Sequence, residues 1–176
     1  MHSSMQHMYI LTITNYLTRW VEVVPLKKIS TNQVINFLEH NIVIRFGTPL
    51  TLVFDNASYF SSYALSQFSL DRDIKIRYST NYYPQGNGLA ESNNKNLTRI
   101  LKKIVTEHQI NWHNELNNAL CANQVTPKQS LGTSPFFSPM VSNPFFLQIS
   151  FFHLCNLHSL SRTFHQIVCR GGLTCY

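Results

Sequence analysis

The most informative segment of the sequence is YYPQGNGLAESNNK, at residues 82–95. Its first half is rich in Pro, Gly and Asn, and it predicts a loop over residues 82–87. From about Gly88 the apolar residues follow helical spacing, which predicts a long helix. Glu91 lies one turn into that helix, where a negative charge is favourable beside the positive end of the helix dipole. Taken alone, Glu91 is therefore explained equally well as a stabilising acid and as a functional carboxylate.

On both sides of this stretch, short apolar segments alternate with turn residues. Their periodicity predicts, in order, two strands at 9–15 and 20–26, a helix at 31–46, a strand at 51–54, a helix at 62–70, a strand at 74–78, and helices from 88 and from 112. The order β-β-α-β-α-β-α-α predicts an α/β fold in which a mixed sheet is flanked by helices.

Asp55 stands out among the few acidic residues, because it comes directly after the apolar strand at 51–54. In α/β proteins, functional sites assemble at the carboxyl ends of strands. The competing interpretation is a turn aspartate that accepts a hydrogen bond from nearby backbone. Exactly one other acid, Glu91, has a comparable context, and 35 residues lie between the two.

The composition describes one domain with a basic balance. The chain has 176 residues, 44% of them hydrophobic, which excludes a disordered protein. Lys and Arg number 14 against 8 Asp and Glu, a net charge of +6, which favours a polyanionic partner only weakly. Four cysteines at irregular spacing do not form a disulfide framework. The first residues lack the pattern of a secretory signal.

The composition changes sharply near residue 140. Residues 141–176 contain no Asp, Glu or Lys and only two Arg, but they hold six aromatic residues and three of the four Cys. This change predicts a folding unit at residues 8–140 and an unrelated, poorly ordered tail at 141–176. Polar residues interrupt the apolar run at 145–160, so no membrane span is expected.

Several segments together resemble the integrase catalytic core of long-terminal-repeat retrotransposons of the gypsy type and of retroviruses. The Asp55 segment, DNASYF, resembles the family's DNGS-x-F, and residues 82–95 resemble its YxPQGNGxxE loop and helix start. The 35-residue spacing is the one that names the D,D-35-E group. The remaining matches are the hairpin at 10–26, the RFG-x-P run at 45–49 and the TSPF run at 133–136.

This resemblance implies an RNase H-like fold and a nucleic-acid enzyme that carries out DNA integration by metal-dependent phosphoryl transfer, or strand transfer. In the family, three carboxylates hold two divalent ions, Mg²⁺ or Mn²⁺, at the scissile phosphodiester. Hard cations of this kind take anionic oxygen ligands. By the motif match, Asp55 and Glu91 are the expected catalytic residues and metal ligands.

The first acid position is the departure from the family pattern. Within the matching context ITNYLTRW, the position aligned with the family's first aspartate holds Asn15. A neutral amide in place of a carboxylate predicts weaker metal binding and impaired strand transfer. Two alternatives follow: a non-catalytic module for nucleic-acid binding or oligomerisation, and a decayed fragment of an element.

A basic flank of the long helix is the expected DNA contact. Lys95 lies four residues after Glu91, and Arg99 and Lys102 continue the same flank. By resemblance, Lys95 and the loop residues Tyr82 and Asn87 lie against DNA. The expected partners are the element ends and target DNA, together with a second copy in a homodimer. An enzyme that acts on chromosomal DNA is expected in the nucleus.

Overall fold

The structure is a computed structural model that describes residues 7–55, 60–78, 84–105, 112–138 and 150–156, with backbone alone for 84–87, 89 and 150–156. The strands are β1 (Tyr9–Asn15), β2 (Val21–Leu26), β3 (Thr51–Phe54), β4 (Lys75–Tyr78) and β5 (Ser150–Asn156). The helical segments are α1 (Thr31–Phe37), η2 (Leu38–Val43), α2 (Ile44–Phe46), α3 (Tyr63–Leu70), α4 (Pro84–Val105), α5 (Trp112–Val125) and the short turn η4 (Pro135–Phe137).

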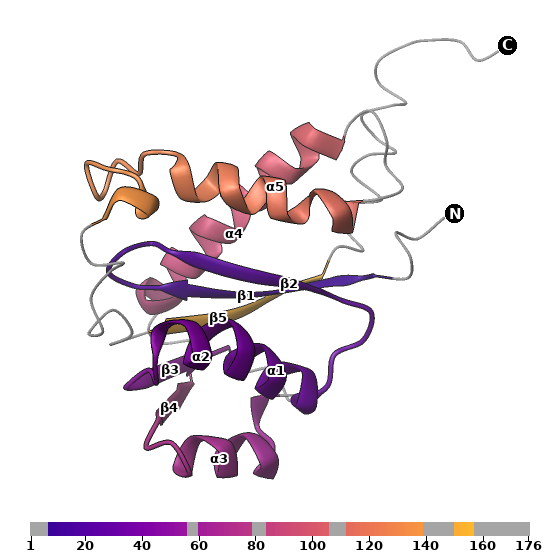
Figure 1. Cartoon of the computed structure of the whole chain (residues 1–176), viewed down its shortest axis with the longest axis vertical. Helices are drawn as coiled ribbons and strands as arrows, with labels where there is room; N and C mark the ends of the chain where they lie inside the picture. The colour runs from indigo at the N-terminus through magenta and orange to yellow at the C-terminus, as the bar shows by residue number, and fades with distance from the viewer. Residues whose placement is uncertain (1–6, 56–59, 79–83, 106–111, 139–149, 157–176) are drawn as a thin grey trace, which may run out of the picture.

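The strands form one mixed sheet in the order β2-β1-β5-β3-β4. β1 runs antiparallel to β2 and to β5, whereas β3 runs parallel to β5 and to β4. Figure 1 shows α4 and α5 on one side of this sheet and α1, α2 and α3 on the other. The predicted class, a mixed sheet flanked by helices, is confirmed.

The middle strand comes from the segment that composition set apart. β5 pairs with β1 along its whole length, from Tyr9 opposite Asn156 to Asn15 opposite Ser150. On its other side β5 pairs with β3. The expectation of an unrelated tail beyond residue 140 is therefore wrong for residues 150–156. Strands pair through their backbone groups, so amino-acid composition does not reveal this pairing.

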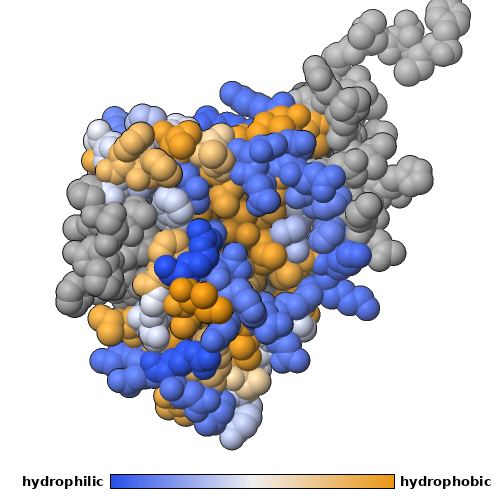
Figure 2. All heavy atoms as spheres, in the orientation of Figure 1, coloured by the Kyte–Doolittle hydropathy of each residue, from blue (hydrophilic) through white to orange (hydrophobic). Residues whose placement is uncertain are grey.

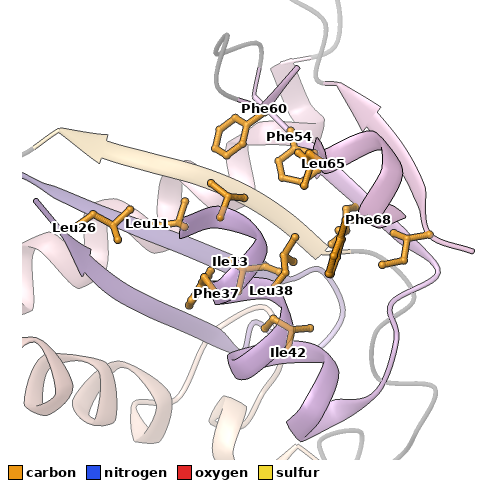
Figure 3. Close-up of a cluster of buried hydrophobic side chains, with 13 residues drawn as sticks. Leu11, Ile13, Leu26, Phe37, Leu38, Ile42, Phe54, Phe60, Leu65 and Phe68 are labelled. Carbon is orange, nitrogen blue, oxygen red and sulfur yellow. The ribbon is translucent and has the colours of Figure 1, made fainter. Parts of the chain in front are cut away.

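One hydrophobic cluster fills the space between the sheet and the layer of α1, η2 and α3. Figure 3 shows Phe54 and Phe60 at one end of this cluster, with Leu65 and Phe68 of α3 close by. Leu11 and Ile13 point into it from β1, since alternate residues of a strand share one face. Its remaining buried members are Leu26, Val34, Phe37, Leu38, Ile42, Leu52 and Ile74.

A second cluster lies on the opposite face, beneath α4 and α5. Ile10 of β1 enters it, which confirms that even-numbered residues of β1 face α4. The other buried members are Val21, Val23, Leu97, Leu101, Val105, Leu116 and Ala119. The two clusters together hold the sheet between two helical layers, the arrangement expected for an α/β domain.

Local signals set the helix boundaries. Ser30 Oγ accepts a hydrogen bond from the Gln33 N–H at 3.4 Å and so caps α1. Gly47, with φ of 91°, ends the helical run at 31–46. The loop predicted over 82–87 is wrong in part: α4 begins at Pro84, and residues 79–83 lie outside the described part of the chain. Proline is favoured at a first helical position, where its missing N–H costs nothing.

Several large hydrophobic side chains remain exposed. Figure 2 shows orange side chains in the middle of the viewed face with blue ones around them. The most exposed are Tyr63, Leu70, Phe137, Ile44, Leu50 and Phe136. Among the described residues, no helix is both long and apolar enough to span a bilayer.

Candidate metal and nucleic-acid site

Asp55 follows the last residue of β3 and is half-buried. Leu52 and Phe54 point into the cluster below the sheet, so Val53 belongs to the opposite face. Continuing this alternation by one residue places Asp55 on the face that α4 covers. Asp55 therefore lies at the C-terminal end of β3, on the side of the sheet where α4 carries Glu91.

A buried hydrogen bond fixes α4 above this part of the sheet. The Thr12 hydroxyl donates to Asn94 Oδ1 at 3.0 Å. Thr12 pairs with His153 of β5, and the β3–β5 register, continued to the end of β3, brings Asp55 level with the same residue. Glu91 lies three residues before Asn94, about 4.5 Å back along the helix axis. Strand alternation therefore turns Asp55 toward the face of the sheet on which α4, the helix that carries Glu91, is packed.

Asn15 does not belong to this group. It pairs with Ser150, and Leu52 of β3 pairs with the same residue, so Asn15 and Leu52 are level. Asp55 lies three residues further along β3 and two strand spacings away, roughly 14 Å from Asn15 between Cα atoms. Asn15 also shares the alternation of Leu11 and Ile13, which face away from α4. The register therefore gives no support to Asn15 as a third ligand beside Asp55 and Glu91.

In the structure, Asn15 stabilises the turn between β1 and β2. Its Oδ1 accepts hydrogen bonds from the Leu17 N–H at 3.0 Å, the Thr18 N–H at 2.9 Å and the Thr18 hydroxyl at 3.0 Å. The residue is only 4% exposed. An Asx side chain that captures backbone N–H groups two and three residues ahead stabilises a turn. Asn15 thus closes the β1–β2 hairpin, a role that an aspartate would fill equally well.

The metal-ligating side chains present determine whether the expected metal centre can form. Asp55 and Glu91 provide hard carboxylate oxygens, which suit a single Mg²⁺ or Mn²⁺. Among the described residues, no group of three or more His, Cys, Asp and Glu side chains lies close enough to share an ion. The arrangement of three carboxylates around two ions is therefore not assembled by the described part of the chain.

Buried polar groups separate β1 from the first half of α4. Thr14 Oγ1, Asn93 Nδ2 and Asn94 Nδ2 are buried and have no hydrogen-bond partner in the structure. Buried polar atoms without partners are rare in folded proteins, and they concentrate at functional sites. The sequence analysis did not predict this layer, although the asparagine pair at residues 93–94, two and three positions after Glu91, is an unusual choice for a helix face packed on a sheet.

The predicted basic flank exists on α4. Lys95 and Arg99 are exposed one helical turn apart, and Lys102 is half-buried further along. The ion pairs between described residues are Arg45–Glu22 and Arg72–Glu39, and neither involves this flank. Tyr82 lies outside the described residues, and so does the side chain of Asn87.

Comparison with known proteins gives a family. The model of the integrase core domain matches residues 1–84. The Gag-Pol polyprotein of avian reticuloendotheliosis virus is 30% identical over 128 residues, which are 73% of this chain and 11% of that protein. The Tf2-3 transposon polyprotein of Schizosaccharomyces pombe is 26% identical over 123 residues, 65% of this chain and 9% of that protein. The chain spans about a tenth of the length of these relatives.

A solved structure has the same fold. The catalytic core domain of HTLV-2 integrase in complex with magnesium, in its trimeric form, superposes with a TM-score of 0.61 at 24% identity. The match covers 73% of this chain and 82% of that one, and a dimeric form of the same core matches with a TM-score of 0.59. At this identity the match establishes the RNase H-like fold alone. Taken with the family match over the first half of the sequence, it shows that this chain carries an integrase-type core of the retroviral integrase superfamily.

Proposed function

We propose that this chain is the DNA-binding core of the integrase of a gypsy-type long-terminal-repeat retroelement. Its partners are the element ends and target DNA, and it acts on chromosomal DNA in the nucleus. The argument that carries the proposal is strand alternation, which turns Asp55 toward the face covered by α4, the helix that carries Glu91 and the exposed Lys95 and Arg99. Cations beside carboxylates suit a phosphodiester substrate. The net charge of +6 has the sign that such a partner needs.

Asp55 and Glu91 would hold a divalent cation, Mg²⁺ or Mn²⁺. Bound there, the cation supplies Lewis-acid stabilisation of charge on a phosphoryl oxygen. Lys95 stands one helical turn beyond Glu91 and would neutralise an adjacent phosphate, so that the scissile group is held against the carboxylates.

Strand transfer by the described residues is expected to be weak, because they supply two carboxylates rather than three. The incomplete ligand set is the proposed cause, and the hydrogen bonds that Asn15 Oδ1 accepts from residues 17 and 18 support a structural role for its amide. A non-catalytic nucleic-acid-binding module is the second candidate function, and the same incomplete ligand set favours it. A homodimer is part of the proposal, since exposed apolar side chains such as Phe137 offer surface for a second copy.

DNA affinity as a function of salt tests the proposal. The whole chain should bind a short fluorescent duplex, and the logarithm of the affinity should fall linearly with the logarithm of the salt concentration. Lys95→Ala should flatten that slope by about 0.9, the value for one lost phosphate contact. Lys75→Ala is the matched control, because Lys75 is exposed on β4 at the far edge of the sheet. Equal slopes for the two variants would contradict the assignment of Lys95.

Metal binding is tested separately by thermal unfolding with added Mn²⁺ or Mg²⁺. A ligand that binds only the folded state raises the unfolding temperature. We expect a small rise for the wild-type chain and none for Asp55→Asn or Glu91→Gln. If both variants keep the rise, the carboxylates are not the ligands. Strand-transfer assays on the same samples then separate a weak enzyme from a binding module.

A further inference from the structure

Helix α4 packs on the sheet through two halves of different chemistry. In the second half, Leu97 and Leu101 are buried in the apolar cluster beneath the helix. In the first half, which carries Glu91, the buried side chains include Asn93 and Asn94. Apolar burial is non-directional, so it sets the rotation of a helix about its axis only loosely. The position of Glu91 therefore depends on the polar contacts of the first half.

A buried hydrogen bond joins this first half to β1. The Thr12 hydroxyl donates to Asn94 Oδ1 at 3.0 Å, and the two residues are only 1% and 4% exposed. A hydrogen bond has a preferred length and direction, and it is stronger in a buried site than in water. This contact therefore fixes both the distance of α4 from β1 and the rotation of the helix about its axis.

Glu91 is sensitive to that rotation. It lies three residues before Asn94, so the two side chains are neighbours on the helix surface. Asn94 is buried and Glu91 is exposed, which places Glu91 at the rim of the face that packs on the sheet. Turning α4 about its axis would move the Glu91 carboxylate relative to the sheet. A metal site requires its ligand distances to be correct within about 0.2 Å, so even a small turn matters.

We propose that Thr12 and Asn94 are positioning residues, whose hydrogen bond holds Glu91 where it can bind a divalent cation. The inference rests on the proposed function, in which Glu91 is a metal ligand. Thr12 and Asn94 are not themselves proposed ligands. They act on Glu91 through the backbone of α4.

The polar atoms around this hydrogen bond support a role beyond stability. Thr14 Oγ1, Asn93 Nδ2 and Asn94 Nδ2 are buried and have no hydrogen-bond partner. A buried polar atom without a partner destabilises the fold, and apolar side chains at these positions would avoid that cost. Departures of this kind from an optimal core are expected at functional sites. They occur here in the half of α4 that carries Glu91.

Calorimetric titration of the whole chain with Mn²⁺ tests the proposal. Thr12→Val removes the hydroxyl and keeps the shape of the side chain, whereas Thr12→Ser retains the donor. We expect Thr12→Val to weaken Mn²⁺ binding about tenfold, the lower end of the range for groups that orient metal ligands, and Thr12→Ser to bind as the wild type does. Leu101→Ala is the matched control, because it loosens the apolar half of α4 and leaves the hydrogen bond in place.

The outcomes distinguish this inference from the function on which it rests. If Glu91→Gln binds Mn²⁺ as the wild type does, or the wild type binds none, the metal site is wrong and the positioning role falls with it. If Glu91→Gln loses binding and Thr12→Val retains it, the site stands and the positioning role is overturned. Equal weakening in Thr12→Val and Leu101→Ala also overturns it, because looser packing of α4 then explains both.

Thermal unfolding first identifies the variants that fold as the wild type does. If Thr12→Val does not fold, Asn94→Ala breaks the same hydrogen bond from the side of the helix. It should weaken Mn²⁺ binding by the same factor, and unchanged binding in a folded Asn94→Ala chain would overturn the proposal.

Discussion

Arg45 Nη1 lies 2.9 Å from Glu22 Oε1, and Trp20 Nε1 donates a hydrogen bond to the same carboxylate oxygen at 2.9 Å. The Glu22 side chain is 6% exposed and that of Arg45 is 47% exposed. A carboxylate this well buried needs its partners, because an unpaired buried charge is costly. The pair also joins β2 to α2, so it links the hairpin to the helical layer below the sheet.

Removal of Arg45 should destabilise the fold more than removal of an arginine whose carboxylate partner is more exposed. We expect Arg45→Ala to lower the free energy of unfolding by about 1–2 kcal/mol, because it leaves Glu22 buried with only the Trp20 N–H. Arg72→Ala breaks the Arg72–Glu39 pair, in which both side chains are 31% exposed, and should cost less than about 1 kcal/mol. Urea denaturation measures both. Equal losses would show that the burial of Glu22 does not matter.

The role of Asn15 as a turn residue leads to the second prediction. Asn15→Ala should destabilise the chain by about 1–3 kcal/mol, because it leaves three hydrogen-bond donors of the turn without their acceptor. Asn15→Asp retains the acceptor, so its stability should stay close to that of the wild type. Neither variant should change strand transfer with Mn²⁺. A strong gain of activity in Asn15→Asp would place this residue at the metal site after all.

Truncation tests the contribution of β5. A chain that ends at residue 140 should lose cooperative unfolding, because β5 lies between β1 and β3 and pairs with both. A chain that ends at residue 156 keeps every described strand and should unfold cooperatively. Circular dichroism during thermal unfolding measures the cooperativity of both truncated chains. A cooperative transition in the shorter chain would show that the sheet closes without β5.

The pH dependence of stability should reveal His113. Burial lowers the pKa of His113 below its ordinary value of 6.5, and the nearby charges of His7 and Lys27 lower it further. The unfolded chain then binds more protons than the folded one near this pH. The contribution of His113 to stability is therefore complete above about pH 6.5 and is lost as the pH falls through the folded-state pKa.

Urea midpoints at about pH 5 and pH 8 measure this contribution. The fall in midpoint on acidification should be smaller in His113→Gln than in the wild type. Lys27→Ala should also reduce it, because it removes one of the neighbouring charges. An unchanged fall in both variants would assign the acid sensitivity to other groups.

The sequence predicts those features that depend on neighbouring residues. The cap at Ser30, the stop at Gly47 and the inward positions of Leu65 and Phe68 all follow from local pattern. Glu22 is different: its context predicts an acid on an exposed strand face, and its burial depends on Arg45, which lies on another element. Contacts of this kind need the folded arrangement before they become visible.

The candidate site shows the same difference between features that depend on a local motif and features that depend on contacts between distant elements. The assignments of Asp55 and Glu91 rest on motif spacing, whereas that of Asn15 rests on matching a turn segment to a catalytic segment. Only the strand register distinguishes a turn residue from a metal ligand at position 15. That register depends on β5, whose composition does not predict its place in the sheet.

The central position of β5 has a consequence for biosynthesis. The strand is the last described element of the chain, so it emerges from the ribosome after every element that it joins. At about 5–20 residues per second, the inner edges of β1 and β3 wait several seconds for their shared neighbour. Unpaired edges are templates for pairing with other chains. A nascent polypeptide of this sequence should therefore depend on chaperones until its final strand has been translated.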